Sequence, residues 1–573
     1  MTMGTSIGSD RPDVDLIVER LSIGECAWAQ TPLLERRDLL LAVGGLGNAH
    51  AEEWVRVAAG IKGLEASSPL VGEEWISGPY MTIASIQALA ETLRQLAAGA
   101  SPLAPYETKA APGGRLSVPV FPHTLFDRLL LSGFSAEVWT TPGVSEELLR
   151  ADAGLGERHP EKTNGIGLVL GAGNIFSIAP LDVLYQLFAY NRTVILKLNP
   201  TTDPLLDVYR AILEPLIHRN LVEIVTGGPD LGSALAHHPG IAAVHMTGSE
   251  ATHDAVVWGI GDEAASARAA GTPRLNKPMT SELGGVSPII IVPGRWSKAD
   301  LRFQAEHVAT QRLHNSGFNC AAGQIVIVSS DWPQKSEFLD ALRCAMASSP
   351  NRSAWYPGCE SRVASAREHH PLAEAVGGTP LRTLLTGLDL THDETAFSTE
   401  YFGPVLGVTD IPGTGVAFLA AAVEAANTRL HGTLGANIIG HPRSIRCMGE
   451  RFKETIAELR YGTVAINAWT GVGYLTPQAT WGAFPGHTLD DVQSGVGVVH
   501  NALLLDHVER TIVTGPFRPS PRSLLHGETS ISPKPPWFTT NKTAARTGRL
   551  LSDFAARPRW RALPAIFASA LRG

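Results

Sequence analysis

Apolar side chains recur at helical spacing in the N-terminal part of the chain. Between about Val14 and Leu96, an apolar stripe runs through each of the segments DLIVERLSIGECAWAQ, LLERRDLLLAVGGLGNAHAEEWVRVAAGI and IASIQALAETLRQLAAG. The pattern predicts an N-terminal layer of packed helices. A stretch rich in proline and glycine, SPLAPYETKAAPGG, ends this layer.

The pattern then changes to short β-rich runs that alternate with helical segments. The first series contains GIGLVLGA, TVILKLNP, LVEIVTGG and AAVHMTG, with helical segments such as PLLDVYRAILEPLI between them. A second series begins near Ser281 with SPIIIV and continues through QIVIVSS, GPVLGVTDI, LGANIIG and TVAIN. Strands that alternate with helices predict parallel sheets covered by helices, and therefore the α/β fold class.

One nearly uncharged segment, residues 166–190, is long enough to cross a membrane. It is interrupted by GAGN and by Ala-Pro-Leu-Asp, which favours a buried strand followed by a packed helix. The N-terminal sequence MTMGTSIGSDRPDVD has early aspartates and no apolar core, unlike a secretory signal. We therefore expect a cytoplasmic protein.

Composition narrows the classes of function. The 573 residues include 47 basic and 55 acidic side chains, and the net charge of −8 argues against a globally basic nucleic-acid binder. The five cysteines are odd in number and form no CxxC pair, so we expect neither a disulfide framework nor a structural zinc site. No H-E-x-x-H motif points to a metal hydrolase.

The C-terminal segment has a different character. From Asn541 onward it carries seven Lys or Arg and one Asp, interleaved with apolar side chains at Trp560, Leu563, Ile566, Phe567 and Leu571. We expect an arm that packs on its own protein or on a partner subunit. Contact with a membrane surface is the alternative interpretation.

Two residues are candidates for catalysis on their local sequence. Cys320, in LHNSGFNCAAGQIVIV, lies among small and polar residues before a predicted strand, where a substrate could approach a nucleophile. Glu282, in TSELGGVSPIIIV, precedes a strongly apolar strand, where desolvation would raise its proton affinity and suit a general base. Taken alone, Cys320 would more often be an inert core cysteine, and Glu282 a solvated carboxylate at a strand end.

Further segments follow these two candidates in a recognisable order. The segments are GAGNIFSIAP with Asn174, TVILKLNP with Lys197, VHMTGSE with Thr247, Gly248 and Ser249, and EYFGPV with Glu400 and Phe402. Over roughly residues 165–497 the sequence resembles the NAD(P)-dependent aldehyde dehydrogenase superfamily. The motifs MTGS, ELGG, Gly-x-x-Cys and E-x-FGPV occur here in the order usual for that family.

The resemblance implies a catalytic mechanism. Cys320 would attack an aldehyde to form a thiohemiacetal, and the Asn174 amide and the Cys320 backbone N–H would hold the oxyanion. A hydride would then pass to the nicotinamide of NAD or NADP. Glu282 would activate the water that hydrolyses the resulting thioester.

The resemblance also implies how the cofactor is bound. Lys197 would contact ribose hydroxyls, Glu400 would bind the nicotinamide ribose, and Phe402 would pack near the ring. Ser249 would meet the pyrophosphate at a helix N-terminus. The remaining expected cofactor contacts are Gly228, Gly232, Thr247, Gly248 and Leu283.

A division of the chain into three parts follows from the resemblance. Residues 1–280 would hold the N-terminal helices and a Rossmann-type cofactor domain, with oligomerisation strands near residues 121–149. Residues 281–467 would form the α/β catalytic domain. Residues 468–573 would return to the cofactor domain and supply an oligomerisation element and the basic extension. The assembly usual in the family is a homodimer or a homotetramer.

Two positions depart from the family pattern. Phe318 replaces a glutamine often found two residues before the cysteine, and we expect it to narrow or dry the tunnel beside Cys320. Pro200 stands where a glutamate often binds the adenosine ribose, which leaves the choice between NAD and NADP open. Possible substitutes are Thr201, Thr202 and Asp203.

The loop after Asn467 bears on the substrate. This loop, AWTGVGYL, supplies Trp469, Tyr474 and Leu475 and contains no Lys or Arg, so we expect an apolar aliphatic or aromatic aldehyde. Two alternatives stay open. A CoA-dependent acylating dehydrogenase or acyl reductase would have no need of Glu282 as a base, and a catalytically silent scaffolding relative would have no need of Cys320, Glu282 and Asn174 together.

Overall fold

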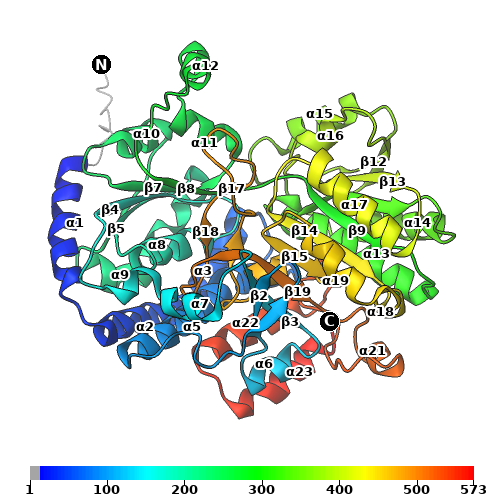
Figure 1. Ribbon diagram of the computed structural model, residues 1–573, viewed down its shortest axis with the longest axis horizontal. Coiled ribbons are helices and arrows are strands. Elements are labelled where there is room, and N and C mark those ends of the chain that lie inside the picture. Colours follow the sequence, from blue (N-terminus) through cyan, green and yellow to red (C-terminus); the bar gives the residue numbers. More distant parts are fainter. Residues whose placement is uncertain (1–12) are drawn as a thin grey trace, which may run out of the picture.

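The computed structural model describes residues 13–573. Most of the segment considered above as a signal sequence, residues 1–12, lies outside the described residues. Figure 1 shows two sheet-containing lobes side by side, with helices from both ends of the chain packed beneath them.

The apolar stripes of the N-terminal part form helices, as predicted. Trp28, Leu40 and Trp54, which lie on these stripes, are fully buried. One π-helical turn, η1, interrupts the layer before its last helix. The helices are α1 (Val14–Ala29), α2 (Leu33–Ala49), α3 (Ala51–Ile61), α4 (Val71–Trp75), η1 (Ile76–Tyr80) and α5 (Met81–Ala97).

The first α/β series forms a six-stranded sheet in the order β17-β8-β7-β4-β5-β6. Its five consecutive strands from β8 to β6 pair in parallel, and β17 adds an antiparallel edge. The strands are β4 (Ile166–Leu170), β5 (Thr193–Lys197), β6 (Val222–Val225), β7 (Ala243–Gly248), β8 (Met279–Leu283) and β17 (Gly495–Val496). The accompanying helices are α8 (Ile178–Phe188), η3 (Pro200–Leu205), α9 (Leu206–Ile217), α10 (Pro229–His237), α11 (Glu250–Val257) and α12 (Gly261–Ala270).

The strand order of this sheet reverses beside β4. From β4 the chain builds outward to β5 and β6 on one side, and then to β7 and β8 on the other. Loops that leave neighbouring strands in opposite directions open a crevice at the carboxyl ends of the strands, where α/β proteins bind ligands. Asn174, Lys197 and Ser249 all follow or end strands at this edge.

The second series belongs to an eleven-stranded sheet in the order β1-β2-β3-β19-β15-β14-β9-β10-β13-β12-β11. The strands are β1 (Lys109–Ala111), β2 (Arg115–Phe121), β3 (Ser135–Thr140), β9 (Ser287–Val292), β10 (Gly323–Ser329), β11 (Ala373–Gly377), β12 (Arg382–Leu388), β13 (Val405–Ile411), β14 (Gly435–Gly440), β15 (Thr463–Ile466) and β19 (Val508–Thr514). Its helices are α13 (Lys298–Leu313), η4 (His314–Gly317), α14 (Lys335–Ser348), α15 (Cys359–His369), α16 (Thr395–Ser398), α17 (Gly415–Arg429), α18 (Pro442–Met448) and α19 (Glu450–Ala457).

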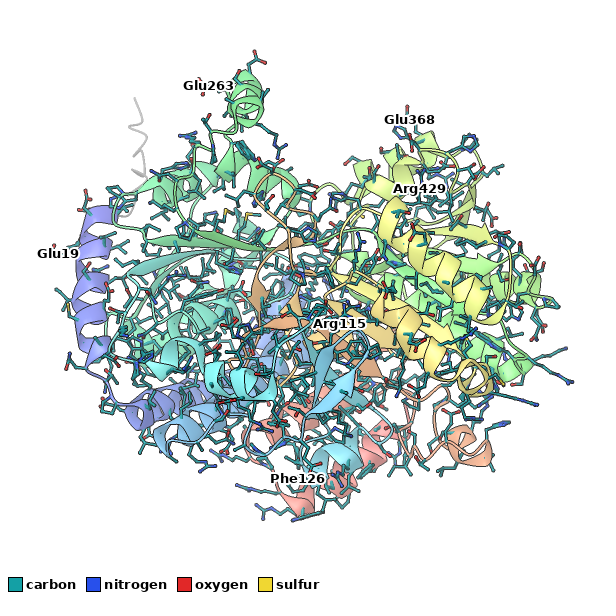
Figure 2. The ribbon with its side chains drawn as sticks, viewed as in Figure 1. Glu19, Arg115, Phe126, Glu263, Glu368 and Arg429 are labelled. Carbon is teal, nitrogen blue, oxygen red and sulfur yellow. The ribbon has the colours of Figure 1, made fainter. Side chains whose placement is uncertain are left out.

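The segment near residues 121–149 contains more than strands. It holds the end of β2, helix α6 (Leu125–Leu130), strand β3 and the start of α7 (Glu146–Asp152). Both strands pair inside this chain, because β3 lies between β2 and β19, and β19 pairs in parallel with β15. Arg115, which is labelled in Figure 2, forms a salt bridge of 2.6 Å with Glu509 and so also joins β2 to β19.

The chain after β15 connects the parts of the molecule. Its elements are α20 (Thr470–Tyr474), β16 (Trp481–Gly482), β18 (Val498–Val499), α21 (Arg522–Leu525), α22 (Ala544–Ala556), η5 (Trp560–Ala562) and α23 (Leu563–Ala570); η2 (Leu155–Arg158) lies earlier, before β4. Helix α22 packs closely on α4, where a Cβ at Gly72 would lie 2.3 Å from the backbone of Ala544. The basic C-terminal segment is therefore an arm packed on its own protein.

The uncharged segment at residues 166–190 contains β4 and α8, and all of α8 is buried. Within residues 13–573, no helix has both the length and the apolar character needed to cross a bilayer.

Candidate active site

The two sheets are connected by a very short link. Strand β8 ends at Leu283 and β9 begins at Ser287, so the three residues 284–286 join a strand of one sheet to a strand of the other. Glu282 lies at the carboxyl end of β8, Cys320 lies just before β10, and Glu400 lies before β13. The carboxyl edge of the smaller sheet therefore meets the amino ends of strands in the larger one.

The loop before Cys320 has an uncommon backbone. Asn315, Ser316 and Gly317 have φ values of 53°, 58° and 81°. Left-handed conformations at non-glycine residues cost free energy and persist where surrounding contacts enforce them. At Gly317 a Cβ would lie 2.4 Å from the Gly403 carbonyl oxygen, so glycine is required there.

Buried hydrogen bonds enforce this loop conformation. The Asn315 backbone N–H donates to Glu73 at 3.0 Å, and the Asn315 amide donates to the Phe318 carbonyl at 3.1 Å. The Asn319 amide donates to the His314 carbonyl at 2.9 Å. The loop is thus held by hydrogen bonds from its own side chains and by a contact with Glu73 of the N-terminal helical layer.

Glu73, on α4, is the external anchor of the loop. It is buried and receives two hydrogen bonds from Arg352, one of them 2.7 Å long. Burial alone would raise the pKa of Glu73, but the Arg352 and His314 side chains lower it to about 2. The carboxylate therefore stays charged at any pH at which the protein works.

Cys320 lines a small cavity of about 50 Å³. Burial raises the pKa of its thiol well above the ordinary value, and the negative charge of Glu282 adds to this effect. The thiol is therefore protonated until a base removes its proton. The other lining residues are Ile76, Ser77, Ile175, Ile178, His314, Asn319, Ala321, Trp469, Gly471, Tyr474, Leu475 and Trp481.

Glu282 faces the Cys320 thiol from the end of β8. Its side chain is buried, and its Oε1 accepts a hydrogen bond of 2.9 Å from the Trp481 indole. Burial raises the pKa of Glu282 to about 7, despite the hydrogen bonds from Trp481 and Cys320. A carboxyl group with this pKa can take up and release a proton near neutral pH.

Asn174 reaches the same loop from the carboxyl end of β4. Its side-chain amide donates to the Phe318 backbone carbonyl at 3.0 Å. Its backbone carbonyl accepts a hydrogen bond of 3.1 Å from the Asn315 side-chain amide. The structure therefore brings Asn174, Glu282 and Cys320 together from three separate parts of the chain.

The residues expected to bind a cofactor lie along the crevice of the smaller sheet. Lys197 ends β5, and among the described residues its ammonium group forms no salt bridge. Burial lowers the pKa of Lys197, and nearby Asp203 opposes this effect. Ser249 is the N-cap of α11, with its hydroxyl accepting from the Thr252 N–H at 3.3 Å, and Gly228 is the N-cap of α10.

Three of the expected contacts are partly committed to other interactions. The Thr247 hydroxyl donates to Asp182 at 3.0 Å. Gly232 is buried within α10, against Leu170, and the Leu283 side chain belongs to an apolar cluster beside the sheet. Gly248 is exposed at the end of β7, next to Ser249.

Glu400 and Phe402 lie beside the link between the sheets. A Cβ at Gly284 would be 2.1 Å from Glu400 Oε1, so the carboxyl group occupies space that only glycine leaves open. Burial raises the pKa of Glu400 to about 7, although Arg312 opposes the effect. The Phe402 ring packs 5.1 Å from that of Tyr356 and 6.0 Å from that of Phe318.

The comparisons with known proteins agree with this geometry. The family model described as "Aldehyde dehydrogenase family" matches residues 176–358, which contain Lys197, Glu282 and Cys320. Residues 176–358 of this chain therefore match the aldehyde dehydrogenase family. Asn174 and Glu400 lie outside the matched residues.

Individual aldehyde dehydrogenases are similar to part of this chain. Betaine aldehyde dehydrogenase 2 of Rhizobium meliloti (strain 1021) is 28% identical over 367 residues, which are 60% of this chain and 67% of the relative. The 4,4'-diaponeurosporen-aldehyde dehydrogenase of Staphylococcus aureus (strain NCTC 8325 / PS 47) is 23% identical over 258 residues, 41% of this chain and 52% of the relative. The chain thus matches about half to two thirds of the length of these two relatives.

A solved structure shows the fold over most of the chain. Indole-3-acetaldehyde dehydrogenase in complex with NAD+ has a TM-score of 0.58 and 17% identity, covering 88% of each chain. At this identity the likeness shows the shared architecture, which is a mixed α/β fold with a Rossmann-like sheet and a catalytic domain.

One prediction for this aldehyde dehydrogenase-type site is wrong. Phe318 was expected to narrow the tunnel beside Cys320, but its side chain is fully buried and packs against Trp355, Tyr356 and Phe402. It does not line the cavity at Cys320. Only its backbone carbonyl, which accepts from Asn174 and Asn315, takes part in the site.

Several residues of the site were not found from the sequence. Trp481 donates a hydrogen bond to Glu282, although the two residues are far apart in the sequence. Ile76 and Ser77, which line the cavity, come from the π-helical turn η1 of the N-terminal layer. Asp182 is buried in α8, with His245 at 3.4 Å and His500 at 3.6 Å. A lone carboxylate inside the apolar run PLDVLYQLF was a visible signal for this buried group.

No metal site accompanies these residues. Within residues 13–573, no three or more His, Cys, Asp and Glu side chains are grouped so that they could bind a metal ion.

Proposed function

We propose that this protein oxidises apolar aldehydes to carboxylic acids, with NAD(P) as the hydride acceptor. One observation carries the proposal: the Cys320 thiol, in a cavity lined by aromatic side chains, faces a buried carboxyl group with a pKa of about 7. A nucleophile beside a base whose pKa lies near neutral pH suits chemistry through a covalent thioester.

The crevice fits a nicotinamide dinucleotide. The buried Lys197 ammonium lies at the strand ends without a salt-bridge partner in the described chain, and suits hydroxyl groups of a ribose. The N-termini of α10 and α11 offer backbone N–H groups to a pyrophosphate. Glu400 and Phe402 would hold the nicotinamide end beside Cys320. When bound, the nicotinamide ring supplies the acceptor for the hydride.

The first chemical task of the protein is to form a carbon–sulfur bond. Glu282 takes the proton of the Cys320 thiol, and the thiolate attacks the carbonyl carbon of the aldehyde. The π electrons of the carbonyl move to its oxygen. The Asn174 amide and the Cys320 backbone N–H donate to that oxyanion, which stabilises the thiohemiacetal.

The second task is to release the acid. Loss of hydride from the thiohemiacetal restores the carbonyl and leaves a thioester on Cys320. Glu282, after giving its first proton to solvent, takes a proton from water as the water oxygen attacks the thioester. The carbon–sulfur bond then breaks, the carboxylic acid leaves, and the sulfur regains a proton.

The structure supports a preference for NAD over NADP. The Thr201 and Thr202 hydroxyls already donate to neighbouring backbone oxygens, at 2.8 Å each. Asp203, in contrast, has a buried carboxylate oxygen without a hydrogen-bond partner and lies close to Lys197. We infer that Asp203 accepts hydrogen bonds from the adenosine ribose and repels a 2′-phosphate.

Absorbance of the reduced nicotinamide over a panel of aldehydes tests the proposal. We expect turnover without CoA for wild type and none for Cys320→Ala, with cofactor binding retained in the variant. Undiminished turnover in Cys320→Ala would refute the assigned nucleophile. Strict dependence on CoA would indicate an acylating enzyme, and cofactor binding without any turnover would indicate a silent relative.

Assembly and location complete the proposal. We propose a cytoplasmic homodimer or homotetramer whose partner is a small-molecule aldehyde and not a nucleic acid. Light scattering on the purified protein measures the assembly directly.

A further inference from the structure

A second, much larger cavity lies beneath the active site. Its volume is about 490 Å³, and its walls come from α5, α6, the segment after α20, and the C-terminal helices α22 and α23. Phe126, on α6, marks this region at the lower edge of Figure 2, close to α22 and α23 in Figure 1. We call this space the apolar chamber.

The C-terminal helices build one wall of the apolar chamber. Phe554 of α22 and Ile566 of α23 are buried, and the Phe126 ring packs edge-on at 5.1 Å from that of Phe554. Leu551 and Phe567 also line the chamber and keep part of their apolar surface exposed. A ligand that covered this surface would gain the free energy of apolar burial.

The charged side chains of the chamber are already paired. Glu91 receives hydrogen bonds from Arg94 and Gln95, and Asp127 caps α6 through the backbone N–H groups of residues 123 and 124. Lys534 contacts Glu306 at 3.5 Å. Because none of these groups is left to bind an opposite charge, the chamber suits an uncharged apolar ligand.

The apolar chamber adjoins the cavity at Cys320. Ile76 and Leu475 line both spaces, so one pair of side chains forms their common boundary. The cavity at Cys320, at about 50 Å³, has about a tenth of the volume of the chamber. The chamber, at about 490 Å³, falls within the range of ligand pockets, about 300–1,000 Å³.

We propose that the apolar chamber holds the hydrocarbon tail of a long-chain aldehyde whose carbonyl group lies at Cys320. The inference rests on the proposed function and adds a role for the C-terminal helices: they close the chamber and so set the chain length. Ile76 and Leu475 form the passage between the reacting carbon and the tail. Short aldehydes need only the cavity at Cys320 and gain nothing from the chamber.

Filling the chamber tests this inference. Ala88, on α5, lines the chamber, whereas Ala97 is exposed at the end of the same helix. We expect Ala88→Trp to lower kcat/KM for dodecanal at least tenfold and to leave kcat/KM for propanal within about twofold of the wild-type value. The matched control, Ala97→Trp, should leave kcat/KM unchanged for both aldehydes.

A second variant guards against misfolding of the first. Phe567→Ala removes an apolar wall side chain without adding volume, and should raise KM for dodecanal about tenfold because apolar contact is lost. Propanal oxidation should again be unaffected. An equal loss for both aldehydes would overturn the assignment of Phe567 to tail binding.

Direct binding separates this inference from the proposed function. Titration calorimetry of dodecan-1-ol into the Cys320→Ala protein should show one site, weakened at least tenfold by a second substitution, Ala88→Trp. Unchanged binding, together with wild-type activity of Ala88→Trp on dodecanal, would overturn the chamber assignment alone. Failure of the wild type to oxidise any aldehyde would overturn the proposed function.

Discussion

Three buried carboxyl groups near Cys320 differ in charge state for a single reason. Glu73 contacts the Arg352 guanidinium, and its pKa is about 2. Glu282 has an indole N–H in place of a cation, and burial raises its pKa to about 7. Glu400 lies near Arg312 without a salt bridge among the described residues, and its pKa is also about 7. Only Glu282 and Glu400 therefore change charge near neutral pH.

The activity should follow the ionisation of Glu282. A base works in its deprotonated form, so kcat should rise as the pH increases through about 7 and level off above it. Glu282→Gln should slow both the first formation of reduced cofactor and the steady-state turnover by about 10²–10⁴-fold, because the same carboxylate activates Cys320 and the hydrolytic water. Stopped-flow absorbance between pH 5.5 and 8.5 measures both effects. A Glu282→Gln variant with wild-type turnover would exclude Glu282 as the base.

The cofactor preference should depend on Asp203. Asp203→Asn removes the negative charge beside Lys197, so the affinity for NADP should improve about tenfold or more relative to NAD. Fluorescence titration of each reduced cofactor gives the ratio of dissociation constants. Asp207→Asn, on the following helix α9, is the matched control and should leave that ratio unchanged. A ratio that is the same in Asp203→Asn and wild type would refute the assignment.

At the scale of elements, the loop that carries Cys320 depends on a helix from a distant part of the chain. Helix α4 brings Glu73 to the Asn315 backbone N–H and to Arg352, while α13 leads directly into the loop. Asparagine adopts the left-handed conformation more readily than most residues, but Ser316 has no such preference of its own. The contact with α4 helps to hold the loop in this conformation.

Loss of this anchor should destabilise the protein strongly. Glu73→Ala leaves the Arg352 charge and the Asn315 N–H buried without a partner, a change that typically costs about 3–5 kcal/mol. Differential scanning calorimetry should show a thermal midpoint lowered by several degrees. Glu53→Ala, at an exposed pair on α3, is the control and should leave the midpoint within about one degree. Equal thermal midpoints for Glu73→Ala and wild type would show that the contacts of Glu73 do not contribute to stability.

Local patterns predicted the elements better than their pairing. Helices α1, α2, α3 and α5 follow from apolar stripes, and β4 and β5 follow from short buried runs flanked by turn residues. Strand β19 could not be placed beside β3 and β15 in this way, because its partners are far apart in the sequence. Pairing over such distances depends on the whole fold and leaves no local signature.

The same distinction holds in the candidate site. Cys320, Glu282 and Asn174 lie in short segments with recognisable sequences, so the sequence alone led to them. Trp481 and Glu73 act through contacts 199 and 242 residues away along the chain, to Glu282 and Asn315. Nothing in their immediate sequence distinguishes them from ordinary buried residues.

At the scale of the whole molecule, two lobes face each other across the cofactor crevice. A side-chain pair also joins them: His431, before β14, lies 2.9 Å from Glu250 at the start of α11. Glu250 raises the pKa of His431, and His431 lowers that of Glu250. The charged pair thus forms beside the N-terminus that is expected to meet the pyrophosphate.

The pair between the lobes should give a pH-dependent stability. Because the pKa of His431 is raised in the folded state, its contribution is complete below the ordinary value of 6.5 and is lost as the pH rises through the folded value. Both side chains are partly exposed, so the effect should be at most about 1 kcal/mol. His431→Gln should lower the thermal midpoint at pH 5.5 more than at pH 8.5. His392→Gln, at an exposed pair within one lobe, is the control.

The partnership of β3 with β19 has a consequence for how the protein is made. Arg115 on β2 and Glu509 on β19 are 394 residues apart in the sequence, yet they belong to neighbouring parts of one sheet. On a ribosome the N-terminal strands emerge first, so the edge of β3 must wait for most of the chain to be translated. An unpaired strand edge invites association with other chains. Nascent chains of this protein should therefore need chaperone protection until β19 leaves the exit tunnel.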